Sequence, residues 1–224
     1  MKKIVLITGT SKGIGKALAA KMLKENYFVI GASREGTVKE IKSEAFYPLR
    51  LDLTIPTSIR EAQKEITENF SSIDILINNA GIGPDLDTLK PKMNSFQQTF
   101  HVNVEGTVFF TEGLIPLIQD QGILLNISSK MGSIAVCELT DAVAYRMSKS
   151  ALNMYTKILS NRLNGKLRVA AIHPGWVKTT LAESNMTNGR LTPNSSAENI
   201  YRFINSDFKN GTFWNAENES DLAW

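Results

Sequence analysis

Short runs of consecutive apolar residues recur along the chain and alternate with longer stretches in which apolar residues are three and four positions apart. The runs lie at 4–7, 28–32, 47–51, 73–77, 123–127 and 169–172. Strands that are buried on both faces are apolar throughout, so these runs indicate a parallel, doubly wound sheet covered by helices on both faces. Thr212–Trp214 is predicted to add a last strand at the edge of the sheet, which makes about seven strands.

The stretches between the runs carry helix signals. Thr57 is a predicted N-cap for a helix that runs through residue 70, and Thr192, followed by Pro193, begins a helix through residue 204. Residues 182–196 are rich in Asn, Ser and Thr and are predicted to form a mobile connection. A long helix after Asp141 carries Tyr145 and Lys149 on one face. Its apolar stripe, on another side, comprises Ala144, Met147, Ala151, Met154, Ile158 and Leu159.

Composition narrows the class of protein. The 224 residues suit one domain, 1–224, built around one core. The formal net charge of +3 comes from interspersed charges, so nucleic acid is not an expected partner. No apolar stretch approaches the roughly 20 residues that span a bilayer, and the lone cysteine, Cys137, cannot form an intrachain disulfide. We therefore expect a cytoplasmic protein without a membrane segment, and a small buried or pocket-lining role for Cys137.

A cluster of glycines follows the first strand directly. The sequence Thr8–Gly15 reads TGTSKGIG, and a helical pattern begins at once after it. At such a strand-to-helix turn, glycine lets a pyrophosphate approach the backbone N–H groups and the helix N-terminus. The spacing differs from GxGxxG and lacks the GK[ST] ending of a P-loop, which argues against ATP or GTP hydrolysis. The residues expected to bind the cofactor here are Gly9, Ser11, Lys12, Gly13, Ile14 and Gly15.

The end of the second strand indicates which dinucleotide binds. It reads Ser33-Arg34, where an acidic residue would normally hold the ribose 2′-hydroxyl of NAD. Arg34 suits a 2′-phosphate instead, and Lys12 can supply a second charge to the same group. We therefore predict NADP(H) as the cofactor.

Tyr145 and Lys149 stand four residues apart, a spacing that stacks a phenol and an ammonium on one helix face. A nearby positive charge favours phenolate and lowers the tyrosine pKa from about 10. Such a tyrosine can give a proton to a carbonyl oxygen during hydride transfer. The YxxxK pair also arises by chance on solvated helix faces, so its meaning depends on the other motifs.

Taken together and in order, these motifs resemble those of the short-chain dehydrogenase/reductase family, a single-domain Rossmann-type fold, from Ile4 to about Trp214. The residues that carry the resemblance are Thr8–Gly15, Asp52, Asn78–Gly81, Asn103, Ser129, Tyr145, Lys149 and His173–Thr179. The interval between Ser129 and Tyr145 is longer than in most members, and residues 137–141 are expected to bulge beside the substrate. With its short length and aromatic tail, the chain looks most like the subgroup of sniffer-type carbonyl reductases and bacterial C-factor proteins.

The resemblance implies a role for each matching residue. Tyr145 would be the acid, Lys149 would hold the nicotinamide ribose, Ser129 would orient the substrate oxygen, and Asn103 would support a proton path. Together these four form the catalytic set, and Ser128 is only a neighbour. Further cofactor contacts implied by the motifs are Ser33, Arg34, Asp52, Leu53, Asn79, Ala80, Gly81, Tyr145, Lys149, Pro174, Gly175, Val177 and Thr179.

The function expected from these residues is NADPH-dependent reduction of a carbonyl on a small ketone, aldehyde or quinone. A protein of a different class stays open: a dinucleotide-binding signalling or sensor protein, C-factor-like, with incidental catalysis. His101 and His173 have no ligand-spaced companions, so no metal is expected. The loops at 83–91 and 181–190 and the bulge around Cys137 carry substrate identity without a readable code, and a homodimer or homotetramer stays open.

Overall fold

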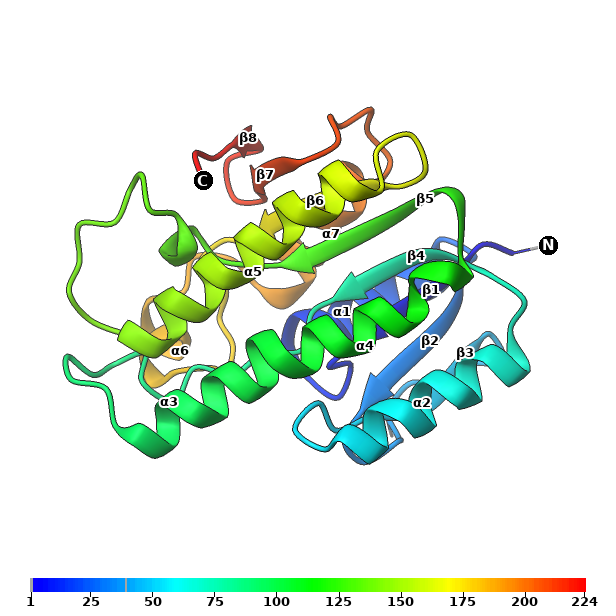
Figure 1. Cartoon of the computed structure of the whole chain (residues 1–224), viewed down its shortest axis with the longest axis horizontal. Helices are drawn as coiled ribbons and strands as arrows, with labels where there is room; N and C mark the ends of the chain where they lie inside the picture. The colour runs from blue at the N-terminus through cyan, green and yellow to red at the C-terminus, as the bar shows by residue number, and fades with distance from the viewer. Residues whose placement is uncertain (1, 39) are drawn as a thin grey trace.

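The computed structural model describes residues 2–38 and 40–224. Its centre is one eight-stranded sheet. The strand order is β3-β2-β1-β4-β5-β6-β7-β8; pairing is parallel from β3 to β7, and β8 is antiparallel to β7 (Figure 1). The strands are β1 Ile4–Thr8, β2 Phe28–Ser33, β3 Phe46–Arg50, β4 Ile73–Asn78, β5 Ile118–Ile127, β6 Arg168–His173, β7 Thr212–Asn215 and β8 Ser220–Asp221. This confirms the predicted α/β doubly wound sheet.

Helices cover both faces of the sheet. They are α1 Gly13–Lys24, α2 Pro56–Asn69, α3 Met93–Phe100, α4 Thr107–Leu114, α5 Val143–Arg162, α6 Glu183–Asn188 and α7 Pro193–Ile204. A π-helical turn at His101–Gly106 joins α3 to α4, and 3₁₀ turns lie at Ile115–Leu117 and Lys130–Gly132. Helices α2, α4 and α5 lie in front of the sheet in Figure 1, and α1 and α7 lie behind it. Within the described residues, no helix combines the length and apolar character that a membrane crossing needs.

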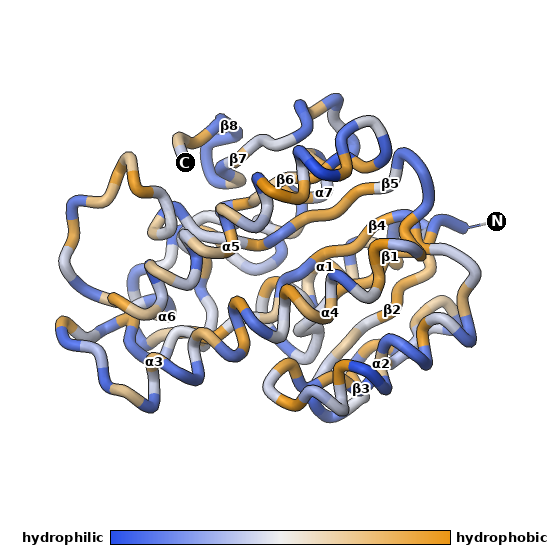
Figure 2. The backbone as a smooth tube through the Cα atoms, in the orientation of Figure 1, coloured by the Kyte–Doolittle hydropathy of each residue, from blue (hydrophilic) through white to orange (hydrophobic). Residues whose placement is uncertain are grey.

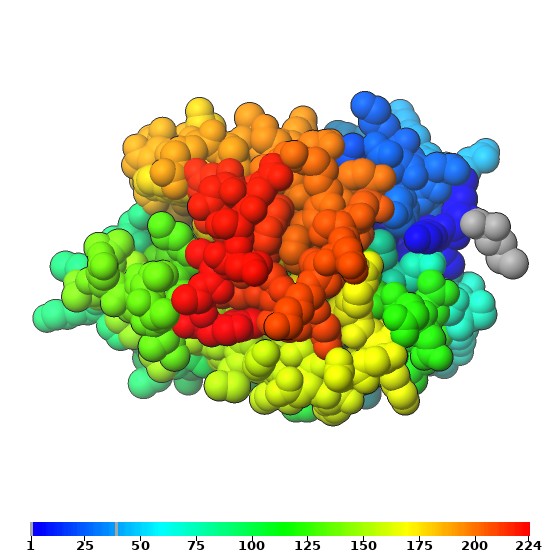
Figure 3. Space-filling view, turned by 90° about the horizontal axis from the view of Figure 1, so that it is seen from above, coloured from blue at the N-terminus to red at the C-terminus, as the bar shows by residue number. Residues whose placement is uncertain are grey.

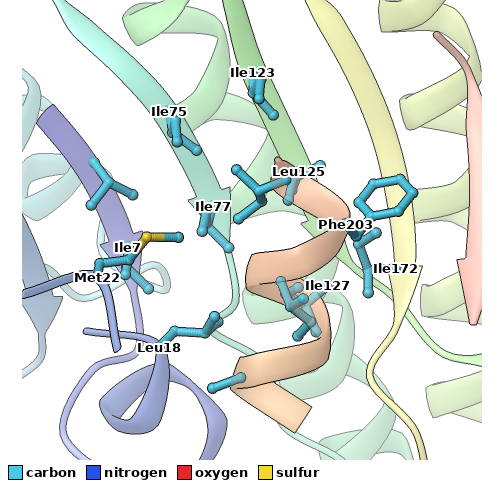
Figure 4. Packing of buried hydrophobic residues seen from close by; sticks show 14 of the residues in the cluster. Ile7, Leu18, Met22, Ile75, Ile77, Ile123, Leu125, Ile127, Ile172 and Phe203 are labelled. Carbon is cyan, nitrogen blue, oxygen red and sulfur yellow. The ribbon is translucent and has the colours of Figure 1, made fainter. Parts of the chain in front are cut away.

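Each face of the sheet has its own apolar core. Behind the sheet, Ile7, Ile77 and Leu125 pack with Leu18 of α1 and Phe203 of α7 (Figure 4). The second core buries residues of β1, β4 and β5 against α2, α4 and α5. The strands are accordingly apolar for most of their length, as Figure 2 shows for β4 and β5. Burial on both faces is the physical reason why the unbroken apolar runs located the strands.

The strand order places a crevice at the carboxyl edge of the sheet. β1 pairs with β2 on one side and with β4 on the other, so the chain changes direction between β1 and β4. Crossovers from neighbouring strands therefore leave on opposite faces at this point, which is where doubly wound sheets bind ligands. The loops after β1, β2, β4, β5 and β6 meet here.

One of the two predicted helix starts is wrong. Helix α2 begins at Pro56 after Ile55, so Thr57 lies inside the first turn and is not the N-cap; proline has a fixed φ and no N–H to satisfy, so it suits the first helical position. By contrast, Thr192 caps α7 as predicted, accepting a bond from the Ser195 N–H at 3.0 Å.

The strand at 212–215 exists, but it is not the edge of the sheet. Ser220–Asp221 pairs outside it as β8, and the Leu222 N–H donates to the Phe213 carbonyl at 2.7 Å. Trp224 stacks on Phe213 with ring centroids 5.3 Å apart. The C-terminal residues thus cross the surface as one continuous red band in Figure 3. Pattern alone had assigned this tail no role.

The apolar stripe predicted for α5 is largely exposed. Met147, Met154 and Ile158 are 49%, 63% and 50% exposed, whereas Tyr145 and Lys149 are buried. The buried face also carries small polar residues whose side chains bond to neighbouring elements, namely Ser148, Asn153 and Thr156. The predicted stripe is therefore divided: Ala144 and Leu159 are buried, whereas its methionines and Ile158 face solvent, and the buried face of α5 mixes apolar with polar residues.

Two loop predictions also change. The segment 182–196 contains helix α6 and the start of α7, and Leu191 forms a parallel bridge with Val177. Cys137 is exposed, not buried, on the loop that precedes α5. That loop projects beyond the end of the sheet in Figure 1, beside the loop that leads into α3.

Candidate active site

A cleft of about 770 Å³ opens at the carboxyl edge of the sheet, where the change of strand direction predicts a binding site. The predicted residues that line it are Gly9, Ser11, Lys12, Gly13, Ile14, Ser33, Arg34, Asp52, Leu53, Asn79, Ala80, Gly81, Tyr145, Lys149, Pro174 and Thr179. Five predicted residues do not line it, namely Gly15, Asn103, Ser129, Gly175 and Val177. Three of these five contact lining residues: Gly15 packs on Gly9, Asn103 bonds to Ile82, and Ser129 interacts with Tyr145.

The glycine loop forms a close-packed backbone turn at one wall of the cleft. Gly9 has a φ of +76°, and its N–H donates to the Ala32 carbonyl at 2.8 Å, which ties the loop to β2. A Cβ at Gly15 would lie 2.2 Å from the Gly9 carbonyl oxygen, so any larger residue would push the turn apart. Helix α1 starts at Gly13 with no side chain capping its first N–H groups. This cradle fits a pyrophosphate, which needs bare backbone and free N–H donors.

Asn79 locks that turn to the next strand. Its side-chain amide donates to the Thr8 carbonyl at 2.8 Å, and the Thr8 hydroxyl accepts the N–H groups of Asn79 and Ala80, both at 3.0 Å. A Cβ at Gly9 would lie 2.9 Å from the Ala80 Cα. The first and fourth strands are therefore held together through side chains at the crevice, and the NNAG motif helps to shape the cofactor wall.

The end of β2 carries basic groups toward the adenosine side of the cleft. Arg34 and Lys12 both line it and both are exposed to solvent. The Asp52 carboxylate also lies at this end, but it accepts bonds from the N–H and hydroxyl of Thr54 at 2.9 and 2.7 Å. The Asp52 carboxylate is thus engaged by Thr54 through one oxygen. Arg34 and Lys12 are the charged groups that can bind an anionic substituent on the ribose.

Tyr145 and Lys149 reach the cleft from α5, one turn apart. The Ser129 side chain interacts with the Tyr145 phenol and lowers its pKa. Ser129 follows β5 and caps the next 3₁₀ turn, where its hydroxyl oxygen accepts the Met131 N–H at 3.2 Å. The Lys149 ammonium lies 5.6 Å from the Tyr145 ring centroid and donates to the Ile127 carbonyl at 2.9 Å. The structure therefore brings together the three residues that the sequence predicted to act together.

The electrostatics of the pair differ from the sequence-based expectation. Burial raises the pKa of Tyr145 to about 12; the Ser129 hydrogen bond opposes this rise, and the nearby Asp85 charge adds to it. Burial also lowers the pKa of Lys149 to about 8. The pKa of Tyr145 is thus raised and not lowered, opposite to the expectation, because desolvation of the buried phenol is the largest effect on it.

Asn103 supports the cleft from behind. Its side chain accepts the Ile82 N–H and donates to the Ile82 carbonyl, both at 2.8 Å, and also donates to the Ser148 hydroxyl at 3.0 Å. It lies on the π-helical turn between α3 and α4, 1% exposed. A Cβ at Gly81 would lie 3.3 Å from the Asn103 carbonyl oxygen and 3.5 Å from the Lys149 nitrogen. Asn103 therefore lies beside Lys149 and fixes the backbone after the NNAG motif.

The loop after β6 closes the opposite side. Gly175 has a φ of +89°, a conformation that side chains rarely adopt, and Val177 is buried. Val177 forms its bridge with Leu191, which anchors the far end of the loop. Thr179 reaches the glycine turn, since a Cβ at Gly13 would be 3.5 Å from its methyl group. The predicted loop residues thus divide into two that line the cleft and two that shape the turn behind it.

Several residues at the site escaped the sequence-based prediction. Lining residues outside the predicted set include Thr54, Ile82, Gly83, Pro84, Gln98, His101, Val102, Ile127, Ser128, Thr180 and Leu181. His101 was assigned a structural role, yet it lines the cleft two positions before Asn103. Asp85 is buried in the loop after the NNAG motif and accepts hydrogen bonds from the start of α5. It belongs to no recognisable sequence motif.

The second histidine is buried and neutral. Burial lowers the pKa of His173 to about 3, and the charges of Lys130 and Arg190 lower it further. In the described part of the chain, no group of three His, Cys, Asp or Glu side chains is placed to hold a metal ion.

Comparison with known proteins gives the family. A family model described as short chain dehydrogenase matches residues 3–189. The serine 3-dehydrogenase of Agrobacterium fabrum is 30% identical over 228 residues, which cover 96% of this chain and 88% of that protein.

Two solved structures align over the whole chain. The NADPH-bound carbonyl reductase from chicken fatty liver has a TM-score of 0.89 at 27% identity, covering 100% of this chain and 94% of that one. The carbonyl reductase Sniffer of D. melanogaster has a TM-score of 0.87 at 26% identity, with 100% of both chains covered. The extent of the family match, together with the order of the motifs around the cleft, means that the chain belongs to the short-chain dehydrogenase/reductase family of NAD(P)-dependent oxidoreductases.

Proposed function

We propose that this enzyme reduces the carbonyl group of a small ketone, aldehyde or quinone with NADPH. One observation carries the proposal: Tyr145 and Lys149 line the same cleft as the glycine turn, and Ser129 is close enough to Tyr145 to lower its pKa. A protein that merely held a dinucleotide would have no use for a buried acid at that place. The carbonyl reductases among the structural neighbours support the same chemistry.

The preference for NADPH rests on the adenosine end of the cleft. Arg34 and Lys12 offer two positive charges there, and the Asp52 carboxylate is engaged by Thr54. A 2′-phosphate would receive charge-assisted hydrogen bonds, whereas the 2′-hydroxyl of NADH offers no anion to the same cations. The chicken carbonyl reductase was solved with NADPH bound.

In the proposed reaction, the bound nicotinamide supplies a hydride to the carbonyl carbon. Tyr145 would give its phenolic proton to the oxygen, so that a ketone, NADPH and one proton yield an alcohol and NADP⁺. Ser129 donates a hydrogen bond to the same oxygen and keeps it within reach of the tyrosine. Burial keeps Tyr145 as the phenol at neutral pH, which is the form that reduction consumes.

The test is a turnover screen with the purified protein. NADPH oxidation would be followed at 340 nm against a panel of quinones, dicarbonyls and aromatic ketones, with NADH run in parallel. Turnover of at least one carbonyl compound, faster with NADPH, is expected. Tight NADPH binding without oxidation of any panel member would contradict the proposal and favour a dinucleotide sensor.

The Tyr145→Phe variant tests the acid directly. It removes the proton donor with little change of shape, so kcat should fall by about 10² to 10⁴ while NADPH binding is kept. Tyr155→Phe is the matched control, since Tyr155 lies on the same helix but bonds to Glu112 at 2.8 Å, away from the cleft. Undiminished turnover in Tyr145→Phe, or an equal loss in both variants, would rule out the assigned role.

A further inference from the structure

Helix α5 carries the candidate acid but does not cap its own N-terminus. The residue before it, Ala142, has a left-handed φ of 51° and no side chain that could accept a hydrogen bond. The first free N–H groups of a helix need acceptors when they are buried. Here the acceptor is the carboxylate of Asp85, from the loop after β4, which accepts the Ala144 N–H at 2.7 Å and the Tyr145 N–H at 3.3 Å.

The loop that supplies this carboxylate is itself tied down. The Asp85 carbonyl accepts both the N–H and the hydroxyl of Thr88 at 3.0 Å. The Thr88 carbonyl in turn accepts the Ala142 N–H at 2.9 Å. The same loop touches the tyrosine ring, because a Cβ at Gly83 would lie 3.0 Å from the ring carbon Cδ2 of Tyr145. Backbone and ring of the candidate acid are thus both held by the segment 83–88.

A helix cap does not require a charged group, and burying the Asp85 carboxylate costs free energy. Asp85 is 1% exposed, and its second carboxylate oxygen is buried without a hydrogen-bond partner among the described residues. Asn, Ser or Thr would cap a helix without that desolvation cost. The helix N-terminus offsets part of the cost by attracting an anion. The negative charge also acts on the phenol of Tyr145.

We propose that Asp85 is a positioning residue for Tyr145: it fixes the start of α5 and thereby the place of the phenol beside Ser129. The proposal rests on the proposed function, because it assumes that Tyr145 delivers a proton. The groups facing Tyr145 are Lys149 from its own helix, Ser129 from the turn after β5, and Asp85 from the loop after β4. Arg146, the next residue on α5, is paired with Asp141 at 2.6 Å.

Two substitutions separate the hydrogen bonds from the charge. Asp85→Asn keeps one oxygen to accept the two N–H groups and removes the charge, whereas Asp85→Ala removes both. Asp85→Ala is expected to lower kcat by about 10- to 100-fold with NADPH affinity unchanged, since a misplaced reacting group costs rate and not cofactor binding. Asp85→Asn should keep most of kcat at pH 6.

The pH profile reports the charge. Loss of a nearby negative charge lowers the pKa of both the Tyr145 phenol and the Lys149 ammonium. The alkaline limb of kcat should therefore move to lower pH in Asp85→Asn, while the melting temperature equals or exceeds that of the parent protein. Amide hydrogen exchange at Ala144 and Tyr145 should be faster in Asp85→Ala and unchanged in Asp85→Asn.

Thr192→Ala is the matched control, because Thr192 caps α7 in the same manner. It should lower the melting temperature without moving kcat or its pH profile. If Asp85→Ala behaves like Thr192→Ala, or if Asp85→Asn is as inactive as Asp85→Ala, the proposal is wrong. Should Tyr145→Phe stay active, the proposed function fails instead, and the exchange rates still report whether Asp85 holds the helix start.

Discussion

The two ends of the cleft are built in different ways. At the cofactor end, bare backbone and side chains bonded to backbone shape the wall: Gly15 packs on Gly9, and Asn79 ties that turn to β4. At the end where we expect the substrate, the loops next to the cleft present apolar side chains to solvent, with Leu89, Ile134 and Leu139 at 69%, 79% and 66% exposed. The cofactor is shared by many enzymes and the substrate is not. A cofactor that does not change can be bound by one close-packed arrangement of the backbone. Exposed loops, by contrast, tolerate different side chains and can therefore suit different substrates.

The sharpest way to break the cofactor end is Gly15→Ala. A Cβ there would lie 2.2 Å from the Gly9 carbonyl oxygen and 2.4 Å from the Asn79 amide nitrogen. We expect NADPH binding to be lost and the free energy of unfolding to fall by about 1–3 kcal/mol. Fluorescence titration with NADPH and urea unfolding measure the two effects.

Gly165→Ala is the control, since it adds a Cβ at a φ of +80° with no atom within 4 Å. It should cost about 1 kcal/mol through backbone strain and leave NADPH affinity unchanged. Normal cofactor affinity in Gly15→Ala would show that the turn tolerates expansion and that the close packing is not what shapes this end.

Arg34→Ala tests the charge at the same end without disturbing the turn. Loss of a charge-assisted bond to a 2′-phosphate costs about 1.5–3 kcal/mol, so KM for NADPH should rise about 10- to 100-fold. KM for NADH should stay the same, because that cofactor has no phosphate there. Lys24→Ala removes an exposed cation at the far end of α1 and should change neither value. Equal effects on both cofactors would contradict the NADPH preference.

Lys149 lies where the two ends of the cleft meet, and we expect its buried ammonium to lower the free energy of unfolding. Its pKa is lowered from 10.5 to about 8, so below pH 8 the folded protein carries a buried ammonium that the unfolded chain would solvate. This penalty is full below pH 8 and fades between pH 8 and 10.5, as the folded protein releases the proton first. Lys149→Met should therefore raise the free energy of unfolding at pH 7 by about 1–3 kcal/mol, after the loss of the bond to the Ile127 carbonyl.

Urea unfolding at pH 7 and at pH 10.5 measures that difference. The gain should shrink at the higher pH, and turnover should be lost at both, which is the pattern of a residue kept for function at the expense of stability. A less stable Lys149→Met at pH 7 would mean that the ammonium stabilises the fold, and would contradict the argument from burial.

The same contrast explains how far the sequence could predict the molecule. The strands follow from apolar runs, the glycine turn and the Tyr145–Lys149 pair follow from residue types and spacing, and Ser129 follows from the family resemblance. The apolar stripe on α5 did not show which of its residues are buried, because periodicity does not tell a buried polar face from a solvated one. Asp85 could not be found at all, since its role depends on a contact between residues 60 positions apart. Sequence patterns reflect local constraints, whereas a polar contact between residues far apart in the sequence produces no recognisable pattern.

The smallest expected effect belongs to the substrate end. Leu139→Ser changes an exposed side chain, so the free energy of unfolding should change by no more than about 0.5 kcal/mol and NADPH affinity should stay the same. If residues 137–141 lie beside the substrate, loss of the leucine contact should lower kcat/KM for apolar carbonyl compounds about fivefold, which corresponds to roughly 1 kcal/mol of lost apolar burial. Met154→Ser, on the outer face of α5 and 63% exposed, is the matched control and should leave kcat/KM unchanged. Because apolar substrates alone gain from the leucine, polar dicarbonyls should be turned over equally well by Leu139→Ser and the parent protein. A uniform loss across the panel would instead place Leu139 in the support of the catalytic helix, and the two ends of the cleft would then be less separate than their construction indicates.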